Sequence, residues 1–380
     1  MSRPLQRAGL SRRVALVLCG ALLAAAAAAQ EPASPPDDIY IPAEPLDRAA
    51  PNYPARALNN RREGWVRVSF IISEEGEVIE PMIEDSSHPD FDESALRAIE
   101  RWRYRPATIG GRPVEQSMVE TMIRYKIQEA NGATPKFTQQ YRKIYALIAA
   151  NNVAEAGPLL QELEAGPLNF YEEAWFWWMK YVYLDATGTA EPAAQMEALS
   201  KALGSSDRED DVYLPPDVYV AASQRLLLLR ARDGDFSGAV TVFQRLTASK
   251  TARKSKVFND VVASLEPVYR EITGLVAGPT VLKQTARVAE HDYWVHRMLR
   301  RSFAVGDVQG GELDVVDVRC TRANRRFVSL PEDAVLKIPD TWGDCSVYIK
   351  GDIGTTFAFE EYPDGFASAA DPAQVAPTLE

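Results

Sequence analysis

The chain has 380 residues and few of the side chains that most often build reactive centres. It contains three histidines and three cysteines. His291 and His296 are five residues apart, which on a strand places them on opposite faces, so the spacing argues against a shared metal site. His88 precedes Pro89 and is expected in a solvated loop. A phosphate-binding glycine loop, paired zinc ligands and a serine nucleophile elbow are also lacking. We therefore expect no enzymatic activity and no cofactor or metal.

The sequence also lacks an apolar run of ordinary membrane-spanning length. The run from Val14 to Ala29 has 16 residues, against about 20 for a spanning helix. Four arginines and no acidic residue precede it, and alanines lead up to Gln30. This pattern predicts a secretory signal in residues 1–29 that is cleaved on export. The alternative is an uncleaved segment that serves as an anchor.

Excess positive charge is missing as well. The chain has 53 acidic and 42 basic residues, a net charge of −11. Loss of residues 1–29 leaves 38 basic residues and a net charge of −15. Such a protein is poorly suited to bind nucleic acid or anionic lipid. Cys320 and Cys345 are the cysteines that remain, and an oxidising compartment favours a disulfide between them. Closing that 25-residue interval contributes roughly 3.5 kcal/mol in the loop-entropy description.

Residues 51–127 have the clearest local pattern. Apolar residues alternate over 65–72, which predicts a strand with one buried face. A turn at 73–76 and a second strand follow, in which Pro81 favours an edge or a bulge. Asp90 and Glu93 resemble a capping box for a helix that extends through Trp102 and ends at Arg105-Pro106. Alternation resumes over 119–127. The prediction is two strands, a helix and a strand, forming a small sheet with one helix packed on it.

Five blocks within this stretch carry a family resemblance. They are Tyr53-Pro54-Ala55-Arg56-Ala57, residues 63–70, Ser86-Ser87, Phe91-Asp92 with Ala95-Leu96, and Trp102-Arg103-Tyr104-Arg105-Pro106-Ala107. Their order resembles the C-terminal domain of the TonB family of energy transducers, over roughly 80 of the 380 residues. The resemblance implies the same arrangement of two strands, a helix and a strand.

The resemblance also implies a binding site. In the family, an extended box peptide of an outer-membrane transporter adds as a strand to the last strand of the sheet, and the Tyr-Pro segment lies near it. Carried over to this chain, the site comprises the segment Asn52, Tyr53 and Pro54 and the strand residues Gln116, Met118, Glu120, Met122, Arg124 and Tyr125. The alternative is that Tyr53-Pro54 only packs the start of the domain onto the sheet.

Other features leave three roles open. The proline-rich segment 30–46 reaches only about 50 Å, and no histidine precedes His88, unlike the long arm and histidine-bearing membrane helix of family transducers. The first role is a periplasmic binding module for an outer-membrane transporter or another cell-envelope protein. The second is a periplasmic scaffold that uses its helical repeats. The third is an inner-membrane energy transducer that meets motor proteins through a retained anchor.

The rest of the chain divides by its periodicity. Residues 134–273 predict three helix–turn–helix units with turns near 151, 187 and 234, similar to tetratricopeptide repeats, or else an ordinary helical bundle. The aromatic helix 169–184 is either buried between its neighbours or a peptide-binding surface. Short alternating runs over 279–361 predict a small antiparallel sandwich or barrel. We thus expect an α+β multidomain chain: signal peptide 1–29, proline-rich linker 30–46, TonB-like domain 47–130, helical repeat region 134–273, C-terminal β domain 279–361 and disordered tail 362–380.

Overall fold

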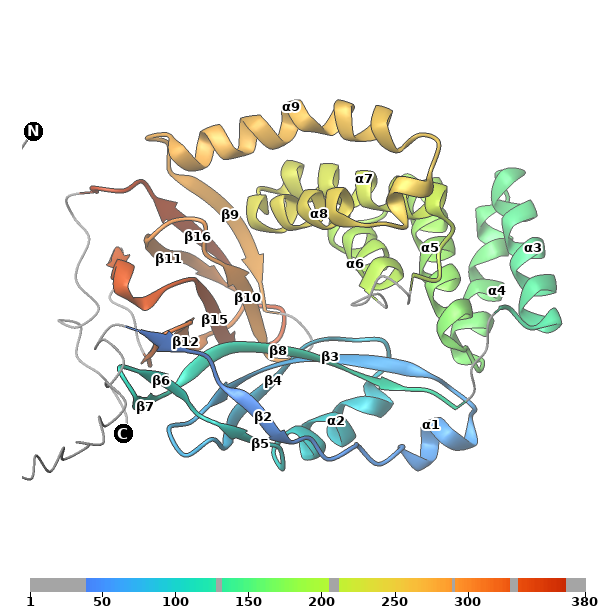
Figure 1. Cartoon of the computed structure of the whole chain (residues 1–380). Coiled ribbons are helices and arrows are strands. Elements are labelled where there is room, and N and C mark those ends of the chain that lie inside the picture. The colour runs from blue at the N-terminus through green and yellow to red at the C-terminus, as the bar shows by residue number, and fades with distance from the viewer. Residues whose placement is uncertain (1–38, 128–131, 205–211, 289–290, 329–333, 367–380) are drawn as a thin grey trace, which may run out of the picture.

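The computed structural model describes residues 39–127, 132–204, 212–288, 291–328 and 334–366. The expected signal peptide, most of the expected tail and the acidic run 207–211 lie outside these ranges. Within them, no helix combines the length and the apolar character that crossing a membrane requires. The fold is α+β, with three groups of elements in chain order (Figure 1).

The first group is built around a three-stranded antiparallel sheet. Strands β3 (Gly64–Ile72), β4 (Val78–Ser86) and β8 (Gln116–Tyr125) are arranged in the order β4-β3-β8, and helix α2 (Asp92–Ile99) packs on one face. The expected order of strand, strand, helix and strand is therefore present. The register of β4 on β3 shifts around Pro81, where Glu80 has a positive φ of 48°, so the predicted edge strand with a bulge is confirmed.

Shorter elements surround this sheet. They are β1 (Tyr40–Ile41), β2 (Glu44–Asp47), α1 (Ala55–Asn59), a 3-10 turn (Pro89–Phe91), β5 (Arg103–Arg105), β6 (Ala107–Ile109) and β7 (Arg112–Val114). Strand β1 pairs with β6, and β2 pairs with β5. Residues 40–46, expected as linker, therefore form strands that pair with this group.

Two local predictions for this region were wrong. Asp90 does not cap α2; instead His88 Nδ1 accepts a hydrogen bond from Asp90 N and caps the 3-10 turn, so His88 is not merely solvated. Helix α2 ends at Ile99 rather than at Arg105, because residues 103–105 pair with β2. The turn at Pro89 and the strand partner thus override the helical spacing of the apolar residues.

The prediction of a single buried face for β3 was also wrong. Val66 and Phe70 face α2 and are fully buried, but Trp65, Ser69 and Ile71 on the other face are at most 1% exposed. The second face is covered by later parts of the chain, above the sheet in Figure 1. An apolar alternation identifies one buried face, but it does not exclude burial of the other by distant residues.

The described residues between 135 and 277 include seven α-helices that share one apolar core. They are α3 (Pro135–Ala149), α4 (Val153–Ala165), α5 (Phe170–Thr187), α6 (Pro192–Gly204), α7 (Pro216–Asp233), α8 (Phe236–Ala248) and α9 (Phe258–Ala277). Turns near 151, 188 and 234 separate the paired helices, and Gly188 and Gly234 end α5 and α7 with the positive φ that glycine adopts most easily. Asn169 and Glu172 form a capping box at the start of α5.

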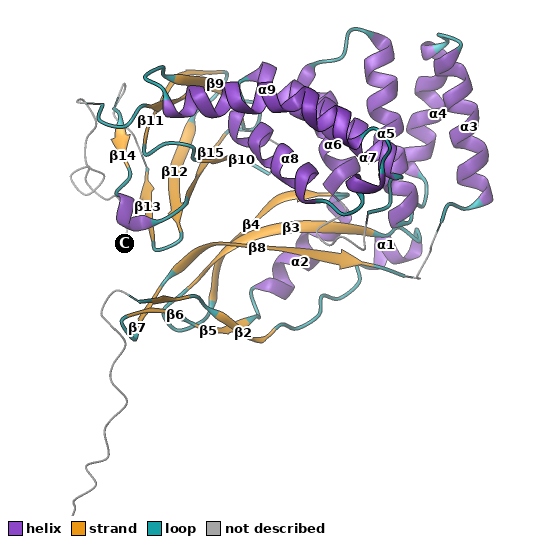
Figure 2. Ribbon diagram, turned by 45° about the horizontal axis from the view of Figure 1, so that its top comes forward, coloured by secondary structure: helices purple, strands orange, loops and turns teal. Residues whose placement is uncertain are grey.

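The third group contains two four-stranded antiparallel sheets that share an apolar core. One has the order β10-β15-β12-β13 and the other β14-β11-β16-β9. Their bounds are β9 (Leu282–Arg287), β10 (Tyr293–Arg297), β11 (Ser302–Gln309), β12 (Leu313–Cys320), β13 (Ala323–Phe327), β14 (Leu336–Lys337), β15 (Cys345–Gly351) and β16 (Thr356–Tyr362). Figure 2 shows these strands at the end of the molecule away from α3 and α4.

Polar contacts hold the groups together. Arg319 of β12 is 2% exposed and donates to Glu80 Oε2 of β4 at 2.9 Å and to Asp317 of its own strand at 2.7 Å. Tyr348 Oη donates to Glu84 at 3.0 Å. Arg67 of β3 donates to the carbonyl of Gly204, at the end of α6, at 3.4 Å. The second face of the β4-β3-β8 sheet is therefore joined to both the helices and the C-terminal strands.

Candidate functional site

Strand β8 is at the edge of its sheet, and among the described residues it pairs with β3 alone. The direction of its backbone groups follows from β3. Ser87 N donates to Trp65 O, so the backbone N–H and C=O groups of Trp65 point towards β4. Because these groups alternate in direction along a strand, those of Val66 and Val68 point towards β8. Thr121 lies directly opposite Val68 and therefore exchanges hydrogen bonds with β3. By the same alternation, the backbone of Met122 points away from β3.

Side chains on β8 divide between the two faces of the sheet. Ile123 and Tyr125 are buried in the core with α2. Glu120, Met122 and Arg124 lie opposite Ser69, Arg67 and Trp65 and so share the second face. Glu120 is exposed, whereas Met122 and Arg124 are half-buried. The free edge thus carries outward-facing backbone groups between an apolar and a charged face.

The electrostatics of the second face are dominated by carboxyl groups. Burial, followed by the nearby Glu120 charge, raises the pKa of Glu84 to about 7, and the hydrogen bond from Tyr348 acts in the opposite direction. Burial also raises the pKa of Asp85, while Lys201 and Arg67 lower it. The acidic side chain of Glu120 is therefore adjacent to a buried carboxyl whose pKa is raised well above its ordinary value.

Tyr53 lies at the Tyr125 end of β8. Its hydroxyl donates to the Arg62 carbonyl at 2.6 Å and approaches the Tyr125 carbonyl at 3.3 Å. Its ring contacts those of Phe91 and Tyr125 edge-on, at centroid distances of 6.1 and 5.6 Å. Burial raises the pKa of Tyr53. These contacts fit the alternative in which the Tyr-Pro segment packs the start of the domain onto the sheet.

The other expected site residues are spread along the strand. Asn52 accepts a hydrogen bond from Ser94 Oγ through its carbonyl, and Pro54 precedes α1. Gln116, at the opposite end of β8 from Tyr53, accepts from Ala43 N at 2.7 Å. Met118 has a positive φ of 58°. The structure thus brings Tyr53 and Tyr125 together but leaves Gln116 and Met118 at the far end.

Two buried glutamates at the end of β8 were missed by sequence reasoning. Glu63 is 5% exposed and accepts from Ile127 N at 2.8 Å and Phe170 N at 3.2 Å, which joins β8 to α5. Glu172 accepts from Thr134 N at 2.7 Å. A cavity of about 650 Å³ lies between these groups and the α3–α4 pair. Of these contacts, only the capping box of Asn169 and Glu172 has a residue pattern that can be identified in the sequence.

The three histidines make separate contacts. His88 caps the turn described above, His291 is 3.2 Å from Asp92, and His296 is 2.6 Å from Glu361. Within the ranges that the structure describes, no three His, Cys, Asp or Glu side chains are grouped as metal ligands would be.

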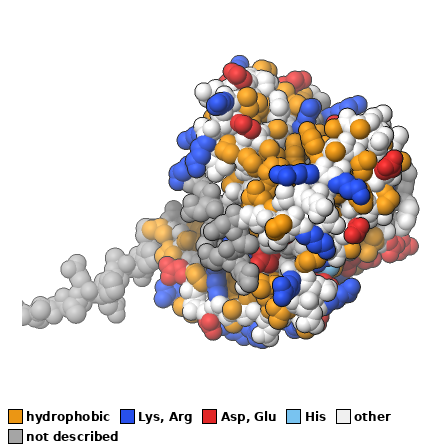
Figure 3. All heavy atoms as spheres, turned by 90° about the vertical axis from the view of Figure 1, so that its right-hand side faces the viewer, with side chains coloured by type: hydrophobic (Ala, Val, Ile, Leu, Met, Phe, Trp, Pro, Cys, Tyr) orange, Lys and Arg blue, Asp and Glu red, His pale blue; other side chains and the backbone are white. Residues whose placement is uncertain are grey.

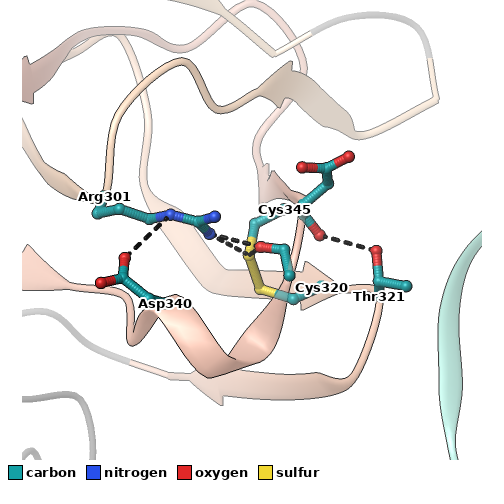
Figure 4. Close-up of a disulfide and its surroundings, with 7 residues drawn as sticks. Arg301, Cys320, Thr321, Asp340 and Cys345 are labelled. Carbon is teal, nitrogen blue, oxygen red and sulfur yellow. Dashed lines mark hydrogen bonds and ion pairs between the residues drawn. A yellow bond between two sulfur atoms is a disulfide. The ribbon is translucent and has the colours of Figure 1, made fainter. Parts of the chain in front are cut away.

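Cys320 and Cys345 form a disulfide, as predicted (Figure 4). They are directly opposite each other on β12 and β15. Arg301 donates to the Gly343 carbonyl beside them. Thr321, next to Cys320, accepts through its carbonyl from Tyr40 Oη of β1 at 3.5 Å. The disulfide is therefore close to the contact between the C-terminal strands and the start of the first group.

Taken together, residues 39–127 form a small α+β domain in which β8 is one of the two edge strands of the β4-β3-β8 sheet. Residues 49–127, about a fifth of the chain, match the family model of the Gram-negative bacterial TonB protein C-terminal.

Comparison with solved structures gives a match to the solution NMR structure of the Pseudomonas aeruginosa TonB C-terminal domain, at 26% identity. The match covers 23% of this chain and 89% of the other, with a TM-score of 0.20. The comparison with curated proteins gave no match.

Proposed function

We propose that this chain is a periplasmic TonB-family protein that binds an extended segment of a cell-envelope partner by strand addition to β8. The observation that carries the proposal is the outer edge of β8, which has no second strand partner among the described residues and where the backbone groups of Glu120 and Met122 point away from β3. Such an edge offers hydrogen bonds that another strand can complete. By family resemblance, the partner is an outer-membrane transporter.

The side chains along this edge favour a peptide over a second copy of the same edge. Glu120, Arg124 and the nearby Lys126 are charged, and charges on an edge strand oppose edge-to-edge association. Met118 and Met122 supply flexible apolar contacts on the same face. Asn52, Tyr53 and Pro54 then act mainly by fixing the Tyr125 end of the strand.

The proposal includes finer assignments for the rest of the chain. Residues 1–29 are a cleaved signal peptide, the paired helices 135–248 are a tetratricopeptide-like array, and the two C-terminal sheets form a sandwich. The array gives the second candidate role, a periplasmic scaffold. An inner-membrane transducer with a retained N-terminal anchor is the third.

The test compares two proline substitutions on neighbouring residues. Met122→Pro removes an outward-facing N–H, so the variant is expected to stay folded and lose affinity for a transporter-box peptide. Thr121→Pro removes a donor from the β3–β8 ladder and is expected to unfold the domain. Met122→Ala is the matched control, and it should bind like the parent because backbone pairing tolerates side-chain change.

Binding is measured by calorimetric titration of the full exported chain, and folding by circular dichroism. A folded Met122→Pro variant that binds the peptide as tightly as the parent would show that strand addition at this edge is wrong.

A further inference from the structure

Strand β8 contains a β-bulge that limits where another strand can pair with its outer edge. Phe70 is paired with Val119 and Ile72 with Gln116, so three steps along β8 are opposite two steps along β3. The extra residue lies between Gln116 and Val119, where Met118 has a positive φ of 58°. A bulge bends its strand and interrupts regular pairing. The regular part of the edge therefore begins at Val119.

Both ends of β8 are in contact with other parts of the chain. At the bulged end, Gln116 Oε1 accepts a hydrogen bond from Ala43 N at 2.7 Å, so the backbone of Ala43 lies beside this end. The opposite end carries the hydroxyl–carbonyl contact at Tyr125 described above. Between the two ends, the backbone groups of Glu120 and Met122 point away from β3. An added strand is therefore short, and its central residues pair with Glu120 and Met122.

The side chain of Glu120 is accessible on this central part of the edge. It is exposed on the second face of the sheet, directly opposite Ser69 of β3. Within the part of the chain that the structure describes, it forms no hydrogen bond or ion pair. Directly opposite residues of paired strands place their side chains on the same face, with Cβ atoms roughly 5 Å apart. The residue of an added strand that pairs with Glu120 therefore places its side chain beside this carboxylate.

A second carboxyl, that of Glu84 on β4, lies on the same face. It accepts a hydrogen bond from Tyr348 Oη at 3.0 Å. Burial raises the pKa of Glu84 most, and the Glu120 charge raises it further, by more than Arg67 lowers it. Arg67 donates to the Gly204 carbonyl at the end of α6, at 3.4 Å. The surroundings of Glu120 thus favour an additional cation, since a positive charge stabilises the charged forms of both carboxyls.

We propose that the segment bound at β8 carries a lysine or arginine at the position that pairs with Glu120, and that Glu120 determines this preference. The inference rests on the proposed strand addition and adds the side-chain chemistry of the partner to it. Opposite charges across a strand pair stabilise the pairing, whereas like charges destabilise it. A long basic side chain opposite Glu120 also extends towards Glu84. A neutral residue at that position leaves both carboxyls without this cation.

The net charge of −11 attracts basic peptides in a general way, so the local effect of Glu120 must be separated from it. On the side of the molecule where α3 and α4 lie, Figure 3 shows Lys and Arg side chains interspersed with Asp and Glu. A carboxylate far from β8 provides the comparison. Glu100 is exposed at the end of α2, which packs on the other face of the sheet. Glu100→Lys changes the net charge as much as Glu120→Lys does.

The test uses two labelled seven-residue peptides of alternating threonine and valine that differ only in a central lysine or glutamine. Each is titrated with the full exported chain and followed by fluorescence anisotropy. A free peptide can shift its register, so the lysine can reach the position opposite Glu120. The parent should bind the lysine peptide on the order of fivefold more tightly than the glutamine peptide. Glu120→Gln should remove this preference, Glu120→Lys should reverse it, and Glu100→Lys should retain it.

Met122→Pro distinguishes a failure of this inference from a failure of strand addition. It should abolish binding of both peptides. If it does so, but the parent binds the two peptides equally, strand addition stands and the basic preference is wrong. Loss of the preference in Glu100→Lys to the same extent as in Glu120→Gln would assign it to net charge and overturn the role of Glu120. If neither peptide binds the parent, or if both bind folded Met122→Pro as tightly, strand addition fails and this inference fails with it.

Discussion

Replacing Glu173 by glutamine should change how the stability of the protein depends on pH. Glu173 lies on α5 against the TonB domain and is 5% exposed. Burial raises its pKa to about 8, although hydrogen bonds from Ser87 and Trp177 act in the opposite direction. The carboxyl is therefore mainly neutral in the folded protein at pH 7.

The direction and the size of the change in stability with pH follow from this raised pKa. The ordinary pKa of Glu173 is 4.5, so between about pH 4.5 and 8 the folded state binds more protons than the unfolded state. The stabilisation is complete below pH 4.5 and is lost as the pH rises through 8, at about 1.4 kcal/mol per pH unit. From pH 5 to 7 the loss is roughly 2–3 kcal/mol. Glutamine does not titrate, so Glu173→Gln should remove this part of the pH dependence.

The assay is urea unfolding of both proteins at pH 5, 6, 7 and 8, followed by tryptophan fluorescence. The free energy of unfolding of the parent minus that of Glu173→Gln should fall by roughly 2–3 kcal/mol from pH 5 to 7. Glu84 titrates in both proteins and cancels in the difference. Glu271→Gln, at an exposed position on α9, is the matched control and should give a difference that is independent of pH. A flat difference for Glu173→Gln as well would refute a neutral buried carboxyl.

Three further outcomes are expected. Arg319→Met should destabilise the protein by roughly 1–3 kcal/mol in chemical unfolding, because Asp317 loses its buried hydrogen-bond donor and then shares only the half-exposed Arg326 with Glu80; an unchanged midpoint would contradict this. Reducing the Cys320–Cys345 disulfide should lower the free energy of unfolding of the protein by up to roughly 3.5 kcal/mol, and its melting temperature with it; free thiols in protein purified without reductant would count against the bond. Intact mass of the exported protein should show loss of residues 1–29, and a full-length species confined to inner membranes would favour the transducer.

Local pattern was enough to predict the centre of the TonB domain. The alternation around Val66 and Phe70, the turn at 73–76 and Pro81 act over a few residues, and the family blocks fixed their order. The buried second face could not be predicted, because its contacts come from residues far away in the sequence: Trp65 lies against Gly204, and Glu84 of β4 accepts a hydrogen bond from Tyr348. The capping box at Asp90 failed because Pro89 starts a tighter turn there.

The candidate site was predictable to a similar extent. The family resemblance located the edge strand, but the outward direction of Met122 requires the observed register of β3 and β8. Glu63 precedes Gly64 and belongs to no helical or capping pattern. Its hydrogen bonds from Ile127 N and Phe170 N therefore could not be predicted from the sequence. The aromatic helix is largely buried among its neighbours, which was one of its two predicted alternatives: Phe176 and Trp177 are buried and Trp175 is half-buried.

Later parts of the chain bury the second face of the β4-β3-β8 sheet, and this burial determines where the chain can be truncated. A fragment that stops at Ile127 would leave Trp65 and Ile71 in water, where each large apolar side chain forfeits roughly 1.5–3 kcal/mol of burial. Such a fragment would need a substitute cover and would tend to aggregate. Truncation or domain exchange is therefore not neutral here: the TonB domain and the regions that follow it behave as one cooperative unit, and any partner of β8 meets the chain as a whole.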